Sequence, residues 1–385
     1  MKLGSEILLA SPRLNGLRVG VLANPASIDR NFHHIADLMA RSQGHTLTAM
    51  FGPQHGYQSN LQDNMIETPH VKDARRDIPI FSLYSETREP TPEMLALIDV
   101  LVVDIQDVGA RIYTFIYTVA NCLRAAARAG IPVIVCDRPN PIGGVAIEGP
   151  TLEPGYESFV GQFRMPMRHG MTVAELALLF NDHFGIGAEL EVIPMQGWTR
   201  ATYWDATGIP WVMPSPNMPT VDTALVYPGM CLVEGTELNE GRGTTRPFEL
   251  AGAPFIDGYA LAEAMTKMDL PGCALRPVVY TPTFHKHGKV ANGGIQIHVT
   301  NAEAFKPYRT GVAFLKACHD LAPSQFQWRH RAYEFVDKIP AIDLLAGNAR
   351  LREGIDAGAS LDDLLARLPR DEGAFAEERA EYLLY

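Results

Sequence analysis

The side chains best suited to do chemistry in this sequence are carboxylates that follow apolar runs. Asp104 and Asp107 lie at the end of DVLVVDIQD, and Glu234 and Glu240 lie in VEGTELNEGRGTT. Hydrolysis of a glycosidic bond needs two carboxyl groups whose pKa values differ because one is more deeply buried than the other. The acids of this chain therefore make cleavage of a sugar the first chemistry to consider.

Each of these acids also has a structural interpretation. Asp104 can pair with Arg111 or Arg138 as a brace, and Glu234 can hold a loop by accepting hydrogen bonds from backbone NH groups. For a single acid the structural role is the more common one, whereas the set taken together favours a cleft.

A second group of polar side chains follows the apolar run TLTAMF, in the stretch FGPQHGYQSNLQDNMIE from residue 51 to 67. Turns at strand ends are usually made of Gly, Pro, Asn and Asp, so they do not require Gln54 or His55. We expect these two side chains to face a ligand. Tyr113 and Tyr117 add flat rings on which a sugar could stack, although such tyrosines are more often part of the core.

The elements that position these side chains are short apolar runs alternating with helix-like stretches through the first 140 residues. This order predicts a parallel sheet with helices on both faces, because parallel neighbours need a crossover between them. Ligands of such Rossmann-like α/β sheets bind beyond the carboxyl ends of the strands, so the polar clusters should meet there. The predicted strands are 17–23, 46–51, 78–84, 99–105 and 131–137.

The chain after residue 150 contains one clear helix before a change of character near residue 226. This helix is predicted at 171–185, where Thr172 acts as cap and Glu175 completes a capping box. His169 lies just before the cap, where free backbone NH groups can hold an anion. We expect a Rossmann-like domain from 1 to 225 and a smaller α+β domain from 226 to 385 that closes the cleft.

The composition excludes several classes of function. With 385 residues and a formal net charge of -11, the chain lacks the surplus of Lys and Arg that a nucleic-acid partner requires. The phosphate-binding patterns GxGxxG and GxxxxGK[ST] are missing, and no CxxC accompanies His285 and His287, so we expect neither a nucleotide cofactor nor a metal. Its apolar runs are too short for a membrane span or a secretory signal, which predicts a cytoplasmic protein.

Several uncommon runs occur in order along nearly the whole chain: FGPQHG, DVLVVDIQDVGARIYTF, DRPNP with IEGP, HGMTVAELA, GWTR, PWVMPSPNMPT, VYPG, EGTELNEGRGTTRPFELAGAP and YLLY. In these runs the sequence resembles the NamZ-type exo-β-N-acetylmuramidases, a family once known only as a domain of unknown function. The resemblance implies a glycoside hydrolase that releases N-acetylmuramic acid (MurNAc) from the non-reducing end of peptidoglycan fragments. It also implies a cleft between a Rossmann-like and a smaller domain, without metal or nucleotide.

The substrate implied by the resemblance is a carbohydrate, either a muropeptide or a disaccharide that contains MurNAc. The lactyl carboxylate of this sugar needs a cationic partner, and Arg111, Arg138 or Arg242 could supply a bidentate one. The residues expected to bind the sugar are Gln54, His55, Asn64, Asp107, Arg111, Tyr113, Arg138, Asn140, His169, Asn217, Glu234, Asn239, Arg242 and Thr244.

One position departs from the family pattern. The usual block reads xPEHG, and its glutamate is the favoured catalytic acid, whereas this chain has Gln54. An amide can neither donate a proton as a general acid nor attack as a carboxylate. Either an acid of the following QDNMIE replaces it, or an acid elsewhere does the chemistry, or the protein binds an amino sugar without cleaving it. The catalytic candidates are Asp63 and Glu67 in the first case and Asp104 and Glu240 in the second.

Overall fold

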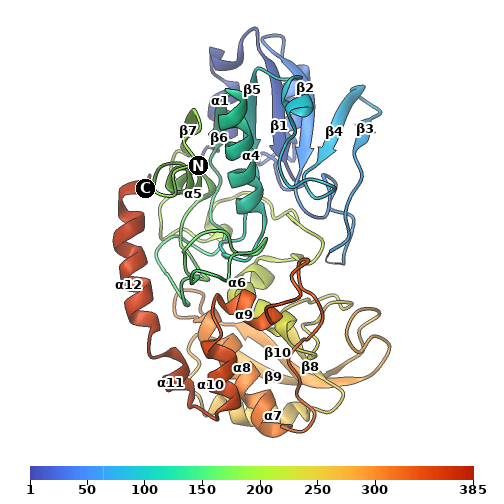
Figure 1. Ribbon diagram of the computed structural model, residues 1–385, viewed down its shortest axis with the longest axis vertical. Coiled ribbons are helices and arrows are strands. Elements are labelled where there is room, and N and C mark those ends of the chain that lie inside the picture. Colours follow the sequence, from blue (N-terminus) through green and yellow to red (C-terminus); the bar gives the residue numbers. More distant parts are fainter. Residues whose placement is uncertain (64) are drawn as a thin grey trace.

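The computed structural model describes residues 1–63 and 65–385, and it contains two sheets at opposite ends of the molecule (Figure 1). The seven-stranded sheet is built from the first half of the sequence and the three-stranded sheet from the second half. Helix α6 (Val221–Met230) and several long loops lie between them. The predicted combination of a Rossmann-like α/β unit and a smaller α+β unit is confirmed.

The large sheet contains β1 (Arg18–Ala23), β2 (Thr46–Gly52), β3 (Val71–Asp73), β4 (Ile78–Ser82), β5 (Val100–Asp104), β6 (Val133–Cys136) and β7 (Leu190–Ile193). Their order is β3-β4-β2-β1-β5-β6-β7, and every neighbouring pair except β3 and β4 is parallel. The central strand β1 pairs with β2 on one side and with β5 on the other. This is where the strand order reverses, so the loops after β1, β2 and β5 are in the position where such sheets bind ligands.

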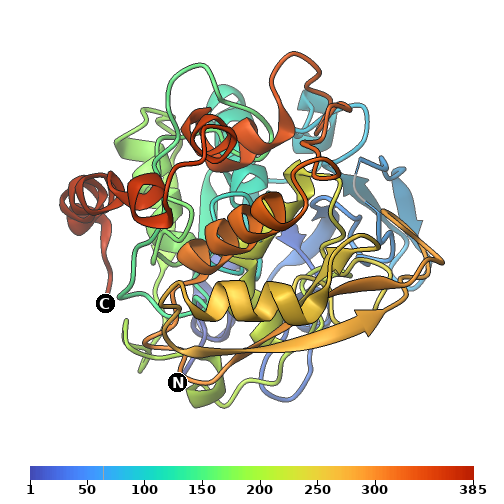
Figure 2. The same cartoon turned by 90° about the horizontal axis from the view of Figure 1, so that it is seen from below.

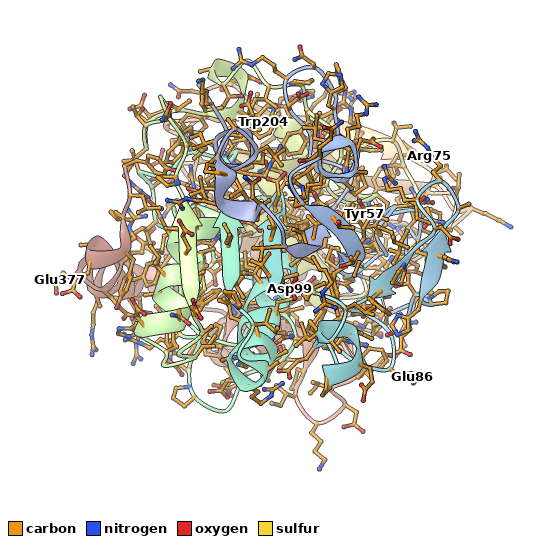
Figure 3. The ribbon with its side chains drawn as sticks, turned by 90° about the horizontal axis from the view of Figure 1, so that it is seen from above. Tyr57, Arg75, Glu86, Asp99, Trp204 and Glu377 are labelled. Carbon is orange, nitrogen blue, oxygen red and sulfur yellow. The ribbon has the colours of Figure 1, made fainter. Side chains whose placement is uncertain are left out.

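Helices cover both faces of this sheet, namely α1 (Gly4–Leu9), α2 (Ile35–Arg41), α3 (Pro92–Leu95), α4 (Phe115–Ala129) and α5 (Val173–Asp182). Helices α1 and α2 lie on one face, and α3 and α4 on the other, as the view from above shows (Figure 3). As predicted, α4 ends at Gly130, whose φ of 65° is left-handed and suits glycine. The side chain of Thr172 caps α5 and Glu175 completes the capping box, also as predicted.

The small sheet consists of β8 (Leu250–Ala253), β9 (Cys273–Tyr280) and β10 (Asn292–Val299), all antiparallel, in the order β8-β10-β9. Helix α7 (Gly258–Thr266) packs on β9 and β10, and α8 (Pro307–Leu321) packs beside α7 (Figure 2). The chain then continues through α9 (Ala341–Ala346), α10 (Arg350–Asp356), α11 (Leu361–Leu365) and α12 (Leu368–Arg379). The described residues also form four short 3-10 helices, η1 (Pro12–Leu14), η2 (Trp204–Ala206), η3 (Cys231–Gly235) and η4 (Ala380–Tyr382).

The last helix, α12, runs back along the molecule to the large sheet (Figure 1). Arg379 at its end donates hydrogen bonds to the carbonyl oxygens of His169 at 2.9 Å and Gly170 at 2.7 Å. The hydroxyl of Tyr385 donates to the carboxylate of Asp137, which follows β6, at 2.8 Å. The second half of the sequence is therefore tied to the first at a point distant from α6. The domain boundary expected between residues 225 and 226 falls within α6, and the division into domains stays a prediction.

In the large sheet all five predicted strands are present, together with two strands that were not predicted, β3 and β7. Strand β3 has three residues that lie mostly at the surface, and β7 is a half-exposed edge strand, so neither has the continuous apolar run of a buried parallel strand. In the part of the chain that the structure describes, no helix is both long and apolar enough to cross a membrane.

Candidate active site

A pocket with about 440 Å³ of empty volume lies where the loops of the two halves meet. This volume includes space that is open to solvent. Its walls come from the loop after β2, the start of α4, the Pro-rich loop before α6, the segment around β8 and the loop between α8 and α9. The lining residues are Gln54, His55, Ile112, Tyr113, Thr114, Phe115, Val160, Ser215, Asn217, Met218, Tyr227, Glu234, Arg242, Phe248, Tyr333 and Glu334.

The carboxyl group of Glu334 lies against the side chain of Gln54 in this pocket. The amide nitrogen of Gln54 donates to Glu334 Oε1 at 3.1 Å, and the hydroxyl of Tyr84 donates to Glu334 Oε2 at 2.7 Å. Glu334 is only 5% exposed, and this burial raises the pKa of its carboxyl group. The hydrogen bonds from Tyr84 and Gln54 lower the pKa by less, so the surroundings favour the protonated acid.

The backbone holds Glu334 in an unusual conformation. Tyr333 and Val336 exchange two backbone hydrogen bonds of 2.9 Å, which close a tight turn around Glu334 and Phe335. Both central residues have a left-handed φ, 45° at Glu334 and 66° at Phe335. For residues with a Cβ atom this conformation costs roughly 1 to 2 kcal/mol each, so other contacts must maintain it.

Glu234 is the second carboxyl group of the pocket, and both of its oxygens accept hydrogen bonds. Glu234 Oε1 accepts from the Arg242 guanidinium at 2.8 Å, and Glu234 Oε2 accepts from the hydroxyl of Tyr333 at 2.7 Å. Arg242 also lies 3.2 Å from Glu240, whose other oxygen accepts from Lys286 at 2.9 Å. Burial alone would raise the pKa of Glu240, but the neighbouring cations, Lys286 foremost, lower it to about 2. Glu240 thus neutralises these cations behind the pocket wall.

His55 contributes a neutral ring to the pocket. Burial, followed by the charge of Arg242, lowers the pKa of His55 to about 4, so the imidazole carries no charge at neutral pH. Because its Nδ1 lies 2.7 Å from the carbonyl oxygen of Leu61, that nitrogen carries the proton and Nε2 keeps its lone pair. The ring can therefore accept a hydrogen bond from a hydroxyl or amide group of a ligand.

The acids expected from the sequence to do catalysis lie outside this pocket. Asp104 is 1% exposed and accepts a hydrogen bond from Arg138 at 2.9 Å, which is the bracing arrangement considered for it. Glu67 is paired with Arg88 at 3.1 Å and its side chain is half exposed. The side chain of Asp63, in the loop after β2, is 47% exposed. Together with Glu240, these are the four catalytic candidates; none of them lines the pocket, and their catalytic role stays a prediction.

The residues expected to bind the sugar divide into two sets. Those that line the pocket are Gln54, His55, Tyr113, Asn217, Glu234 and Arg242. Within the described chain, those that lie elsewhere are Asp107, Arg111, Arg138, Asn140, His169, Asn239 and Thr244. Asn64 is outside the described residues.

The side chains of the second set make interactions that hold loops in place. Arg111 is fully buried and donates to the carbonyl oxygen of Leu345 at 2.7 Å, and Arg138 is the partner of Asp104. Of the three arginines considered for the lactyl carboxylate, Arg242 alone lines the pocket. The remaining contacts are those of Asn140 with Met171, Asp107 with His169, Asn239 with Lys286, and Thr244 with Gly241.

The anion site considered before α5 is filled by the protein itself. The carboxylate of Asp137 accepts from the backbone NH of Ala174 at 3.0 Å, and Thr172 and Glu175 use the capping positions. The ring of His169 accepts from the NH of Met171 at 3.1 Å. These contacts occupy the amino-terminal end of the helix.

Sequence reasoning missed Glu334 and its neighbour Tyr333. They belong to the run YEFVD between α8 and α9, which has no glycine and no apolar strand before it. The rule that acids at strand ends gather at the sheet edge could not find them, because they reach the pocket from the other half of the molecule.

The fold and the pocket define an α/β protein with two buried glutamates at the carboxyl edge of its parallel sheet, closed by a second unit. Within the described residues, no group of three or more His, Cys, Asp or Glu is arranged to hold a metal ion. The chain belongs to the family of exo-β-N-acetylmuramidase NamZ, whose N-terminal model matches residues 19–222 and whose C-terminal model matches residues 225–385.

Known proteins of similar sequence and structure agree with this membership. The chain is 43% identical over 373 residues to peptidoglycan β-N-acetylmuramidase NamZ of Bacillus subtilis, covering 97% of this chain and 88% of that protein. Two crystal structures of DUF1343 family proteins from Bacteroides fragilis have the same fold. Their TM-scores are 0.90 and 0.78 at 32% and 28% identity, each covering 100% of this chain and 98% of the other.

Proposed function

We propose that this protein is an exo-β-N-acetylmuramidase, a glycoside hydrolase that releases MurNAc from the non-reducing end of peptidoglycan fragments. Family membership and the Bacillus subtilis relative support this activity. The observation that carries it is the pair of glutamates in one buried pocket, Glu334 beside an amide and Glu234 beside a guanidinium. Glycoside hydrolysis requires two carboxyl groups in unequal surroundings.

We assign the action on the anomeric carbon to Glu234. The bond to the leaving group breaks through a transition state with positive charge on the sugar ring, and a carboxylate stabilises this charge. Arg242 and Tyr333 keep Glu234 in one orientation, since each binds a different oxygen of the carboxylate. The pocket thus holds the carboxyl group of Glu234 in a fixed orientation.

The rest of the pocket suits a sugar with an acidic substituent. Tyr113, Tyr227 and Phe248 offer flat apolar faces, and Tyr227 packs edge-on against both of the other rings. Among the described lining residues, Arg242 is the only arginine or lysine, so we assign the lactyl carboxylate of MurNAc to its side of the pocket.

The direct test uses two substrates. The purified protein is incubated with the disaccharide MurNAc-GlcNAc and with 4-nitrophenyl β-MurNAc, and free MurNAc is measured by mass spectrometry. Release of MurNAc from either compound supports the proposal. Binding of MurNAc-GlcNAc in calorimetry without any release would instead identify a sugar-binding protein, the alternative that Gln54 raised. The cytoplasmic location expected from the sequence is part of this proposal, and fractionation of the producing cells tests it.

A further inference from the structure

We propose that Glu334 is the general acid of this site and that Gln54 and Tyr84 position it. This inference rests on the proposed function and adds a catalytic residue to it. The acid comes from the loop between α8 and α9, and the two positioning side chains come from the large sheet, so the catalytic arrangement forms only when both halves of the chain are in place.

The hydrogen bonds around Gln54 have a fixed direction. The hydroxyl of Thr114 donates to Gln54 Oε1 at 2.7 Å, so the amide oxygen is used and the NH2 group faces Glu334. Gln54 and Tyr84 each donate to a different oxygen of Glu334. The NH2 group of Gln54 cannot accept a proton from Glu334, and the hydroxyl of Tyr84 acts as a donor to it in this arrangement. We assign the O–H bond of the protonated acid to the side of the pocket that Glu334 lines.

Contacts from the first half of the chain hold the strained turn that carries Glu334. The backbone NH of Glu334 lies 3.2 Å from the sulfur of Met65, in the loop after β2. The guanidinium of Arg88 lies 5.4 Å from the ring of Phe335 and 4.1 Å from the ring of Tyr84. A left-handed backbone at two consecutive residues with side chains persists only where neighbours impose it, and such strain concentrates at active sites.

Burial is the physical reason that Glu334 keeps its proton to a higher pH than a free carboxyl group does. It raises the pKa of Glu334, and the nearby charge of Glu234 raises it further. Glu234 itself is bound by Arg242. The two carboxyl groups thus differ in the way that an acid and its partner must differ.

The proton transfer follows from this arrangement. The proton of Glu334 moves to the glycosidic oxygen while the bond between this oxygen and the anomeric carbon breaks, and the electron pair of that bond stays with the oxygen. Water then gives its hydroxyl group to the anomeric carbon, and its remaining proton goes to a carboxylate of the pocket. The products are MurNAc and the shortened fragment, and one water molecule is consumed.

The test compares leaving groups in Glu334→Gln, which keeps the shape of the side chain. A sugar hydroxyl leaves poorly without a proton, whereas 4-nitrophenolate is a weak base that leaves without one. We expect kcat/KM for MurNAc-GlcNAc to fall about 10²- to 10⁴-fold, with a much smaller fall for 4-nitrophenyl β-MurNAc. The alkaline limb of the pH profile of kcat/KM should also disappear. Glu263→Gln, an exposed change on α7, is the matched control and should leave both rates unchanged.

Tyr84→Phe tests positioning without removing the acid. Because the hydrogen bond from Tyr84 lowers the pKa of Glu334, its loss should move the alkaline limb to higher pH. A merely structural tyrosine would change the thermal midpoint and leave the limb in place. If the wild type cleaves MurNAc-GlcNAc and a folded Glu334→Gln keeps its rate, this inference is wrong while the proposed function stands. If the wild type releases MurNAc from neither substrate, the proposed function itself fails.

Discussion

Replacing Gln54 by glutamate puts a second carboxyl group where an amide now donates to Glu334. The two contacting atoms are 3.1 Å apart, and two charges at this distance repel by about 5 kcal/mol at an effective dielectric constant of about 20. Since 1.36 kcal/mol corresponds to one pKa unit, full ionisation of the pair is delayed by roughly 3 to 4 units. The side chains can move apart, so about 2 units is the smallest delay that we expect. Between the pH at which the first carboxyl group ionises and the pH at which the second one does, the pair shares one proton and remains able to donate it.

The measurement is the pH profile of kcat/KM for MurNAc-GlcNAc, whose alkaline limb reports loss of the essential proton in the free enzyme. In Gln54→Glu this limb should lie at higher pH than in the wild type. Gln58→Glu adds the same charge at an exposed position of the same loop and should leave the limb in place. An unchanged limb in a folded Gln54→Glu would refute the reasoning, because the proton in question would then not be on Glu334.

The same substitution has a defined effect on stability. The new carboxyl group has a higher pKa in the folded protein than in the unfolded chain, so the folded state binds more protons. Its stabilising contribution is complete below the unfolded pKa of about 4.3 and is lost as pH rises through the folded pKa. Gln54→Glu should therefore unfold at a lower denaturant concentration than the wild type at pH 8 and approach it at pH 4.

Three further substitutions test other parts of the structure. Burial raises the pKa of Glu148 to about 7. The favourable contribution of Glu148 to folding stability is therefore complete below its pKa in the unfolded chain and is lost as pH rises to about 7. In denaturant titrations at pH 8, Glu148→Gln should stabilise the protein by on the order of 3 kcal/mol. Lys286→Met removes a cation that neutralises the buried charge of Glu240 and should lower the free energy of unfolding by about 3 to 5 kcal/mol. A second change, Glu240→Gln, should restore part of this loss. Glu67→Gln removes an ion pair with Arg88 at the surface and should change kcat by less than about twofold. Loss of turnover in Glu67→Gln would return this acid to the list of catalytic candidates.

The fold could be predicted because its main signals are local. Each buried parallel strand is a continuous apolar run, and α4 and α5 carry their cap residues, Gly130 and Thr172, in the sequence itself. The two strands of the large sheet that were not predicted, β3 and β7, lie at its edges, where half-exposed residues give no such run. Burial on both faces therefore makes a strand recognisable in the sequence.

The site was harder to predict because it depends on which distant segments meet. The loop after β2 and the run VEGTELNEGR supplied Gln54, His55, Glu234 and Arg242, all of which line the pocket. Asp104 has the same position at a strand end, yet an arginine nearby in space binds it in the interior. Glu334 lies 280 residues from its partner Gln54. No spacing rule connects side chains so far apart, and only the packing of one half on the other brings them together.

The return of α12 to the large sheet limits how the two halves can move. A body fixed at two separate places can turn only about the line that joins them, and here those places are α6 and the contacts of Arg379 and Tyr385. Opening or closing of the pocket is thereby confined to rotation about this one axis, whereas a single connection would leave every direction of rotation free. Any movement of the two halves around a bound glycan is therefore a hinge motion of fixed direction.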